Sequence, residues 1–183
     1  MVPRPLSRRA SVRLRRASQY GCPVTERHRL VRVPASSANL GPGYDVMAVA
    51  LDIFLELEVR ECGEFSVDCD LAGVPLDRDN LVVRAFETLH SADGINFKVG
   101  GDIPLARGMG SSAAAIVAGI VAADHLFELG LSREEMLEHA NRLEGHPDNV
   151  AAALSGGFVI CAEQDGRVIS TRVDSPEGLE GIL

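Results

Sequence analysis

A turn rich in glycine and serine, residues 104–114, constrains this chain more than any other stretch, because it runs straight into an apolar helical sequence, residues 115–121. Gly108 and Gly110 can adopt positive φ angles and so let an anion approach the main chain. The N–H groups in the first turn of the following helix have no intrahelical acceptor, and the helix dipole favours an anion there by about 0.3–1 kcal/mol. The stretch therefore predicts a phosphate-binding loop, to which the two serines after Gly110 add hydroxyls for phosphate or a hydrated metal.

Three other interpretations of this loop compete with the first. A Walker A loop requires lysine and then serine or threonine after its last glycine, whereas Ser111 and Ser112 follow Gly110, which argues against a P-loop NTPase. Residues 108–113 fit the dinucleotide-binding pattern G-x-G-x-x-A, but that fold needs an acidic residue at the end of the next strand, and here the nearby acids lie in a helical pattern. The third interpretation, in which the small residues only allow close packing, stays open.

Composition limits the class of protein. With 183 residues, of which 46% are hydrophobic and 24% charged, the chain can bury a core and suits one domain, or one domain and part of another. Its longest apolar run, residues 113–123, is too short to span a bilayer, so we expect no membrane partner. The cysteines are scattered without a C-x-x-C pair, which favours reduced thiols and a cytoplasmic location over a disulfide framework or a zinc site.

Charge divides the chain unevenly. Residues 1–23 hold six arginines and no acid, so the net charge of −8 conceals a body that is more acidic still, which argues against nucleic acid as a partner. We expect residues 1–23 to be a disordered basic leader, and hypothesise that translation starts near Val24 and that the leader is a mis-annotated start. Residues 24–175 are expected to form the domain, and residues 176–183 a truncated linker.

Hydrophobic periodicity predicts an α+β fold, a mainly antiparallel sheet with helices packed on one face. We expect a strand followed by a loop over residues 35–45, then a meander, and a hairpin near the end. The predicted strands cover residues 30–34, 51–59, 65–69, 95–103, 158–162 and 167–173. Helices are expected after the N-cap Asn80, after the glycine loop as far as about Phe127, and after a capping box that begins at Ser132.

Polar residues form three clusters that need one explanation: Asn39 with Asp45, the glycine loop with Ser112, and residues 144–149. Phosphoryl transfer would unite them, with nucleotide phosphates on the loop. Magnesium prefers hard oxygen ligands, and Ser112 and Glu144 can supply two beside phosphate and water. Asp45 with Asn39 could hold a small cationic or hydroxylated molecule in line with the γ-phosphoryl group.

The third cluster also has structural explanations. Glu144 could simply end a helix, Asp148 could serve as an N-cap for residues 149–154, and His146 could be a hydrogen-bonded turn residue. The residues alone leave these alternatives open.

At three motifs, residues 33–45, 104–114 and 144–151, the sequence resembles homoserine kinase, a family of the superfamily that also contains galactokinase and mevalonate kinase (the GHMP kinases). The resemblance covers about residues 30–162. It implies the GHMP-kinase N-terminal fold, which is like domain 2 of ribosomal protein S5. It also implies ATP-dependent phosphorylation of the L-homoserine hydroxyl to O-phospho-L-homoserine, a step toward threonine.

By resemblance, the roles of single residues follow. Ser112 and Glu144 would hold Mg²⁺, while Asn149 stands near the position where relatives place a catalytic base, so that catalysis would rest on positioning and charge neutralisation. The residues expected to contact homoserine are Asn39, Asp45, His146 and Asp148. Those expected to bind ATP are Pro104, Leu105, Ala106, Arg107, Gly108, Met109, Gly110, Ser111, Ser112, Ala113 and Ala114.

Members of the family continue into a second α+β domain, whereas this chain stops at Leu183. We therefore expect a fragment with little or no kinase activity, whose partner is a second copy or a separately encoded C-terminal half. Two alternatives remain: a nucleotide-binding module without catalysis, and a GHMP kinase that acts on another small alcohol.

Overall fold

Two long antiparallel strands, β3 (His28–Leu40) and β4 (Gly43–Glu61), form the spine of the sheet. The computed structural model describes residues 4–5, 11–13, 27–71, 73–174 and 180–181. The other strands are β1 (Arg4–Pro5), β2 (Ser11–Arg13), β5 (Ser66–Cys69), β6 (Ile95–Gly101), β7 (Phe158–Gln164), β8 (Arg167–Val173) and β9 (Glu180–Gly181). The helices are α1 (Leu81–Glu87), α2 (Ser111–Phe127), α3 (Arg133–Glu144) and α4 (Pro147–Ser155).

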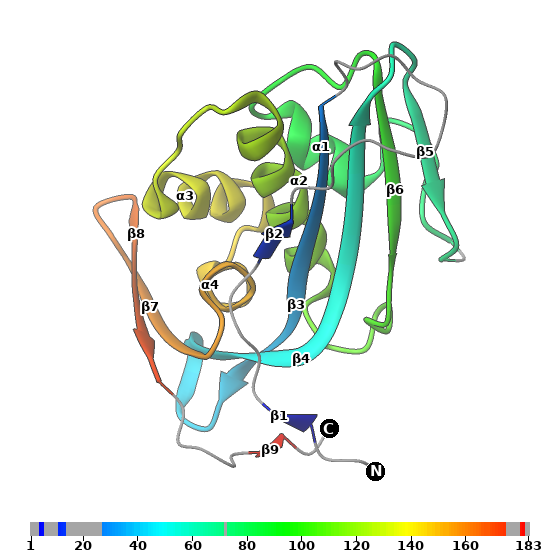
Figure 1. Ribbon diagram of the computed structural model, residues 1–183. Coiled ribbons are helices and arrows are strands. Elements are labelled where there is room, and N and C mark those ends of the chain that lie inside the picture. The colour runs from blue at the N-terminus through cyan, green and yellow to red at the C-terminus, as the bar shows by residue number, and fades with distance from the viewer. Residues whose placement is uncertain (1–3, 6–10, 14–26, 72, 175–179, 182–183) are drawn as a thin grey trace.

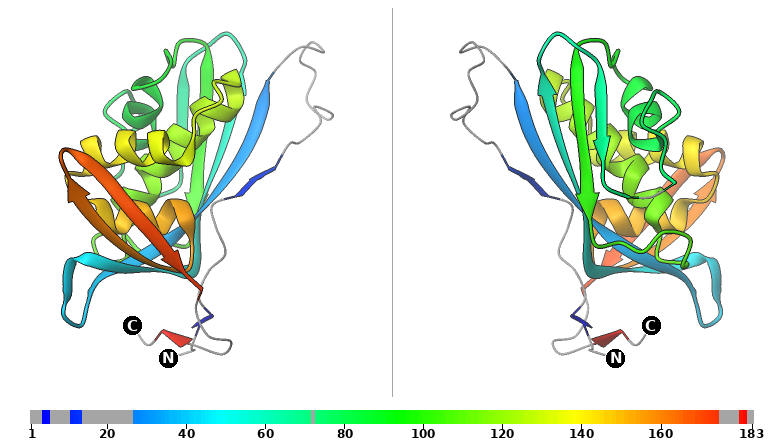
Figure 2. Two further views of the ribbon diagram at one scale, coloured as in Figure 1. Left: turned by 90° about the vertical axis from the view of Figure 1, so that its left-hand side faces the viewer. Right: turned by 90° about the vertical axis from the view of Figure 1, so that its right-hand side faces the viewer.

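The main sheet has seven strands in the order β2-β3-β4-β6-β5, and the first part of β4 also pairs with β7, which pairs with β8. Every pair in it is antiparallel except β5 with β6, and the helices lie on one face (Figures 1 and 2). The predicted α+β class is confirmed. The predicted meander is wrong, because β5 pairs with β6 rather than with β4.

The segment expected to be a loop, residues 35–45, is instead the end of a β-hairpin. β3 continues through Leu40, and a two-residue turn that begins at Gly41, with a φ of 57°, returns the chain to β4. The ladder shifts register between Pro34 and Ala35, so the ribbon bends and its end reaches β7 beside α4 (Figure 1). Local sequence suggested a loop because glycine and proline there mark the turn itself.

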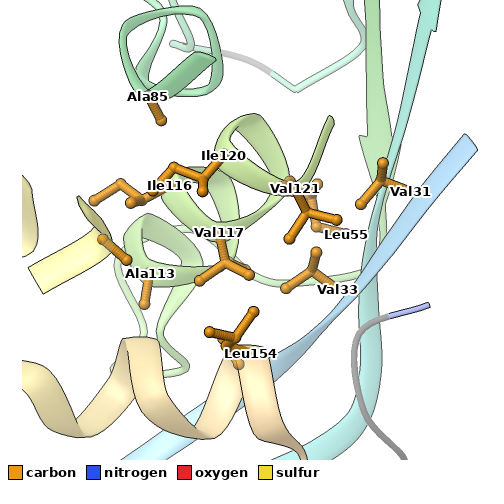
Figure 3. Packing of buried hydrophobic residues seen from close by; sticks show 14 of the residues in the cluster. Val31, Val33, Leu55, Ala85, Ala113, Ile116, Val117, Ile120, Val121 and Leu154 are labelled. Atoms are coloured by element: carbon orange, nitrogen blue, oxygen red, sulfur yellow. The ribbon is translucent and has the colours of Figure 1, made fainter. Parts of the chain in front are cut away.

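The central helix α2 holds the layers together. Its side chains are buried around almost the whole circumference, as the apolar sequence predicts. Figure 3 shows Val117 and Val121 directed toward Val33 and Leu55 of the sheet, while Ala85 of α1 lies on another side of the helix. Each fully buried aliphatic side chain contributes about 1.5–3 kcal/mol, so this helix supplies a large share of the driving force for folding.

The predicted N-terminal caps of α1 and α3 are confirmed. The Asn80 side chain accepts from the Val82 N–H at 2.9 Å, and Ser132 forms the expected capping box with Glu135. The residue that caps α4 is His146, with Pro147 at the first helical position, so Asp148 is not the N-cap. The β7–β8 hairpin turns at residues 165–166, also as predicted.

Parts of the predicted basic leader are strands. β1 pairs with β9, and β2 pairs with the outer side of β3. These five residues form strands, while residues 1–3, 6–10 and 14–26 lie outside the described residues, so the disordered leader stays a prediction. The start near Val24 and the domain boundaries stay predictions. Among the described residues, none of the helices has both the length and the apolarity that crossing a bilayer requires.

The crossing of α1 and α2 yields a test of this packing. A Cβ on Gly119 would lie 2.3 Å from the Val82 carbonyl oxygen, so we expect Gly119→Ala to lower the free energy of unfolding by about 1–3 kcal/mol. The matched control is Gly100→Ala, whose Cβ would meet nothing within 4 Å, and which should change stability by less than about 0.5 kcal/mol. Urea unfolding measures both, and equal midpoints for the two variants would contradict the close crossing.

Candidate functional site

The glycine loop leads into an uncovered helix start. Ala106, Gly108 and Gly110 have positive φ angles of 55°, 70° and 61°, and the loop is exposed. Gly110 is the N-cap of α2 and makes no side-chain capping bond, so the first-turn N–H groups face the loop without a cap from it. This is the geometry in which main-chain N–H groups can receive phosphate oxygens.

The two glycines of the loop differ in their surroundings. A Cβ on Gly108 would meet nothing within 4 Å, whereas a Cβ on Gly110 would lie 2.1 Å from the Ser36 hydroxyl oxygen. Close packing therefore accounts for Gly110 but not for Gly108. The open approach at Gly108 favours access of a ligand to the main chain.

Ser112 and Glu144 come together at the start of α2, although they are 32 residues apart in the chain. The Ser112 hydroxyl, from the first turn of α2, donates to the Glu144 carboxylate at the end of α3. α3 ends there because Gly145 adopts a left-handed conformation. Two hard oxygen ligands are thus adjacent, the donor type that Mg²⁺ takes.

A metal at this position would need further ligands. Among the described residues, no group of three or more histidine, cysteine or acidic side chains gathers into a metal site. Mg²⁺ keeps several waters and commonly joins one or two protein oxygens to substrate phosphates. The pair of Ser112 and Glu144 fits that use, in which the nucleotide completes the ligand set.

Ser36 connects the glycine loop to α4. Its hydroxyl donates to the Asn149 side-chain oxygen at 2.9 Å, and its backbone N–H donates to the Met109 carbonyl at 3.1 Å. Sequence reasoning included Ser36 in a motif but gave it no role. The predicted catalytic residue Asn149 therefore lies against the loop, directly beside Gly110.

Asp148 and Cys161 extend these contacts to the β3–β4 hairpin. Asp148 is only 2% exposed, and its carboxylate accepts from the Asn149 N–H at 2.6 Å. Burial, and secondly the negative charge of Asp148, raise the pKa of the Cys161 thiol to about 11. That thiol, on β7, donates to the Val46 carbonyl of β4 at 3.3 Å, which joins β7 to the β3–β4 hairpin.

The hairpin holds the predicted substrate residues in unusual backbone conformations. Asn39 and Asp45 have φ angles of 59° and 54°, and the Asp45 N–H donates to the Asn39 side-chain oxygen at 2.8 Å. That bond leaves the Asn39 amide nitrogen and the Asp45 carboxylate for other partners. His146 is exposed, and its side chain makes no hydrogen bond among the described residues. The structure therefore does not include His146 in these contacts.

A largely apolar cavity of about 320 Å³ is lined in part by Leu105, Ser111 and Ser112 of the loop. Sequence reasoning missed it, because its walls come from segments with no shared motif: the β5–α1 connection, the start of α1 and the end of β6. The lining residues are Leu55, Leu71, Gly73, Val74, Pro75, Asp79, Asn80, Leu81, Val82, Val99, Gly100, Gly101, Ile103, Leu105, Ser111, Ser112 and Ala115.

Comparison with known proteins shows what these motifs are similar to. Residues 80–157 match the GHMP kinases N-terminal domain. Homoserine kinase from Lactobacillus acidophilus is 45% identical over 138 residues, which cover 74% of this chain and 48% of that protein. Homoserine kinase from Streptococcus gordonii is 45% identical over 148 residues, covering 79% and 51%.

Solved structures agree with the sequence comparison. The crystal structure of homoserine kinase from Cytophaga hutchinsonii has a TM-score of 0.69 and 29% identity, covering 87% of this chain and 55% of that chain. The chain spans about half the length of the curated relatives it matches.

The raised pKa of Cys161 predicts its chemical reactivity. With a pKa of about 11, only about one thiol in a thousand is ionised at pH 8, and the side chain is buried. We expect iodoacetamide at pH 8 to modify the exposed Cys62 of the native chain and to reach Cys161 only after unfolding in urea. Peptide mass spectrometry measures each site, and equally rapid native labelling of both cysteines would contradict the buried position of Cys161.

Proposed function

We propose that this chain, whose residues 80–157 match the GHMP kinases N-terminal domain, takes part in ATP-dependent phosphorylation of the side-chain hydroxyl of L-homoserine. The product is O-phospho-L-homoserine, an intermediate toward threonine, and the proposed location is the cytoplasm. One observation supports the proposal most: Ser112 and Glu144 place two hard oxygens at the uncovered start of α2.

The nucleotide is proposed to lie along the loop. Its phosphates would bind the first-turn N–H groups of α2 and the main chain of residues 104–114, where Gly108 leaves room. The apolar cavity beside Ser111 and Leu105 is of a size and character suited to the base. The proposed phosphate site and the apolar cavity are adjacent, so one nucleotide could occupy both.

Mg²⁺ is proposed to be held by Ser112 and Glu144 together with phosphate oxygens and water. When bound, it neutralises charge on the phosphates that develops during transfer. Glu144 also holds the Ser112 hydroxyl in place through the hydrogen bond between them, so the two oxygens are arranged before a metal arrives.

The amino-acid substrate is proposed to lie between the hairpin and α4. The Asp45 carboxylate suits the ammonium group, and the Asn39 amide nitrogen, Asp148 and His146 are further candidate contacts. Asn149 carries no charge and cannot remove a proton at neutral pH. Its proposed part is to orient the attacking hydroxyl, so that transfer depends on positioning and on charge neutralisation.

Membership of the reaction and catalysis by this chain alone are separate questions, because the chain spans about half the length of the curated relatives it matches. We propose that full activity of these 183 residues depends on a partner, which is a second copy or a separately encoded chain. Titration of the purified chain with Mg-ATP and then with homoserine, beside an assay for ADP, tests this. Homoserine-dependent release of ADP by the chain alone would contradict the need for a partner, whereas nucleotide binding without turnover agrees with it and also with a nucleotide-binding module.

The metal ligands can be tested by removing one charge. We expect Glu144→Gln to weaken binding of Mg-ATP at least about 10-fold, because an amide is a poorer ligand for Mg²⁺ than a carboxylate, while binding of ATP in EDTA changes little. Glu134→Gln, the same change in the first turn of the same helix, is the matched control. Isothermal titration measures the affinities. Equal affinities of the two variants for Mg-ATP would remove Glu144 from the proposed site.

The substrate contact at Asp45 gives a second test. We expect Asp45→Asn to weaken binding of homoserine roughly 10-fold or more, since a charge-assisted bond to the ammonium is lost, and to leave Mg-ATP affinity unchanged. Asp52→Asn, an exposed acid further along β4, is the control. Preference for an alcohol without an ammonium group, such as mevalonate, would instead support a GHMP kinase with another acceptor.

A further inference from the structure

Ser36 is a buried polar residue that contacts several parts of the candidate site. It is fully buried, at 0% exposure, and joins three parts of the chain. Its hydroxyl donates to the Asn149 side-chain oxygen, its N–H donates to the Met109 carbonyl, and its side chain fills the space where Gly110 has no Cβ. A polar side chain with this burial is held by its partners rather than by solvent.

We propose that Ser36 is a positioning residue, which fixes the Asn149 carboxamide with its nitrogen free to donate a hydrogen bond to the attacking oxygen of the substrate. This inference rests on the proposed function and goes beyond it. It assigns to Ser36 the orientation of Asn149 and the connection between Asn149 and the phosphate loop.

The orientation follows from the chemistry of the two side chains. A carboxamide has one oxygen that accepts and one nitrogen that donates, and they lie on opposite sides of its carbon. The Ser36 hydroxyl proton is directed at Oδ1, which leaves Nδ2 on the other side. Within the described residues Nδ2 of Asn149 has no hydrogen-bond partner, and the side chain is half-buried, so the nitrogen is available to a ligand.

The main chain at Asn149 is held as well. Its N–H donates to the Asp148 carboxylate at 2.6 Å, so backbone and side chain are each fixed by a separate partner. During transfer the substrate oxygen bonds to the γ-phosphorus, the bond from phosphorus to the ADP oxygen breaks, and the hydroxyl proton passes to solvent. A donor at Nδ2 aligns the oxygen for that attack without accepting the proton.

Gly110 shows that the bond and the loop depend on each other. A Cβ there would lie 2.1 Å from the Ser36 hydroxyl oxygen and 3.2 Å from the Asn149 side-chain oxygen. The hydrogen bond between Ser36 and Asn149 therefore lies directly against the last glycine of the phosphate loop. Through the bond to Met109, the same serine holds the loop that would carry the phosphates.

The chain offers a matched control in the next residue. Successive side chains of a strand point to opposite faces, so Ser37 lies away from Asn149. Ser37 is half-buried, and its side chain has no hydrogen bond among the described residues. Ser37→Ala thus makes the same chemical change as Ser36→Ala without touching the proposed interaction.

The first measurement needs no ligand. In the full chain labelled with ¹³C and ¹⁵N, the Asn149 carboxamide carbon reports whether its oxygen accepts a hydrogen bond. We expect Ser36→Ala to move this signal upfield, and Ser37→Ala to leave it in place. An unchanged signal in Ser36→Ala would overturn the proposed bond, whatever the protein binds.

The second measurement adds Mg-ATP and homoserine. We expect the ligands to shift the Nδ2 proton signals of Asn149 in the unsubstituted chain and in Ser37→Ala, and not in Ser36→Ala, although Ser36→Ala still binds both. Equal ligand-induced shifts in Ser36→Ala would overturn the positioning role. If the unsubstituted chain binds neither ligand, the proposed function fails and the substrate-orienting role fails with it, while the carbon signal still reports the bond.

A double-mutant cycle separates positioning from support of the fold. The assay uses the chain alone if it turns over substrate, and otherwise the chain together with the partner that restores turnover. We expect Ser36→Ala to lower kcat roughly 10-fold and to leave KM for ATP unchanged. In an Asn149→Ala background the same change should cost nothing further, since Ser36 acts through Asn149. Additive losses would assign Ser36 a structural role instead.

Discussion

The burial of α2 is the constraint on which the rest of the structure depends. Its sequence is apolar almost all the way round, so the sheet, α1, α3 and α4 must enclose it. A helix enclosed in this way meets solvent mainly at its ends, and here its first turn follows a loop of small residues. Main-chain N–H groups are therefore presented at one place on the surface, and the layers that cover α2 also bring Glu144 and Asn149 to that place.

Side chains from distant segments then join three polar clusters into one continuous set of contacts. Ser112 contacts Glu144, Ser36 joins the loop to Asn149, and Cys161 joins β7 to the β3–β4 hairpin. Each contact spans more than 30 residues of sequence. The sites proposed for a nucleotide and for a small amino acid would therefore both be fixed by the same packed elements.

Local pattern predicted some elements and misjudged others for a definable reason. Caps at Asn80 and Ser132 and the hairpin turn at residues 165–166 depend on neighbours in sequence, and those predictions are confirmed. The pairing of β5 with β6, and the continuation of β3 through Leu40, depend on which distant strand is available. Alternating hydrophobicity indicates that a segment is a strand, but it carries no information on its partner.

The sequence by itself determined the class of fold, the buried central helix, the glycine loop at its start and the likeness of these motifs to homoserine kinases. These properties lie in contiguous residues, where periodicity and turn chemistry act over a few positions. Only the tertiary structure decided that the Ser112 hydroxyl contacts Glu144, that Ser36 contacts Asn149, and that segments without a shared motif enclose the 320 Å³ cavity. Those contacts arise when distant segments bury apolar surface against one another. A pattern within a few neighbouring residues does not predict which distant segments will meet.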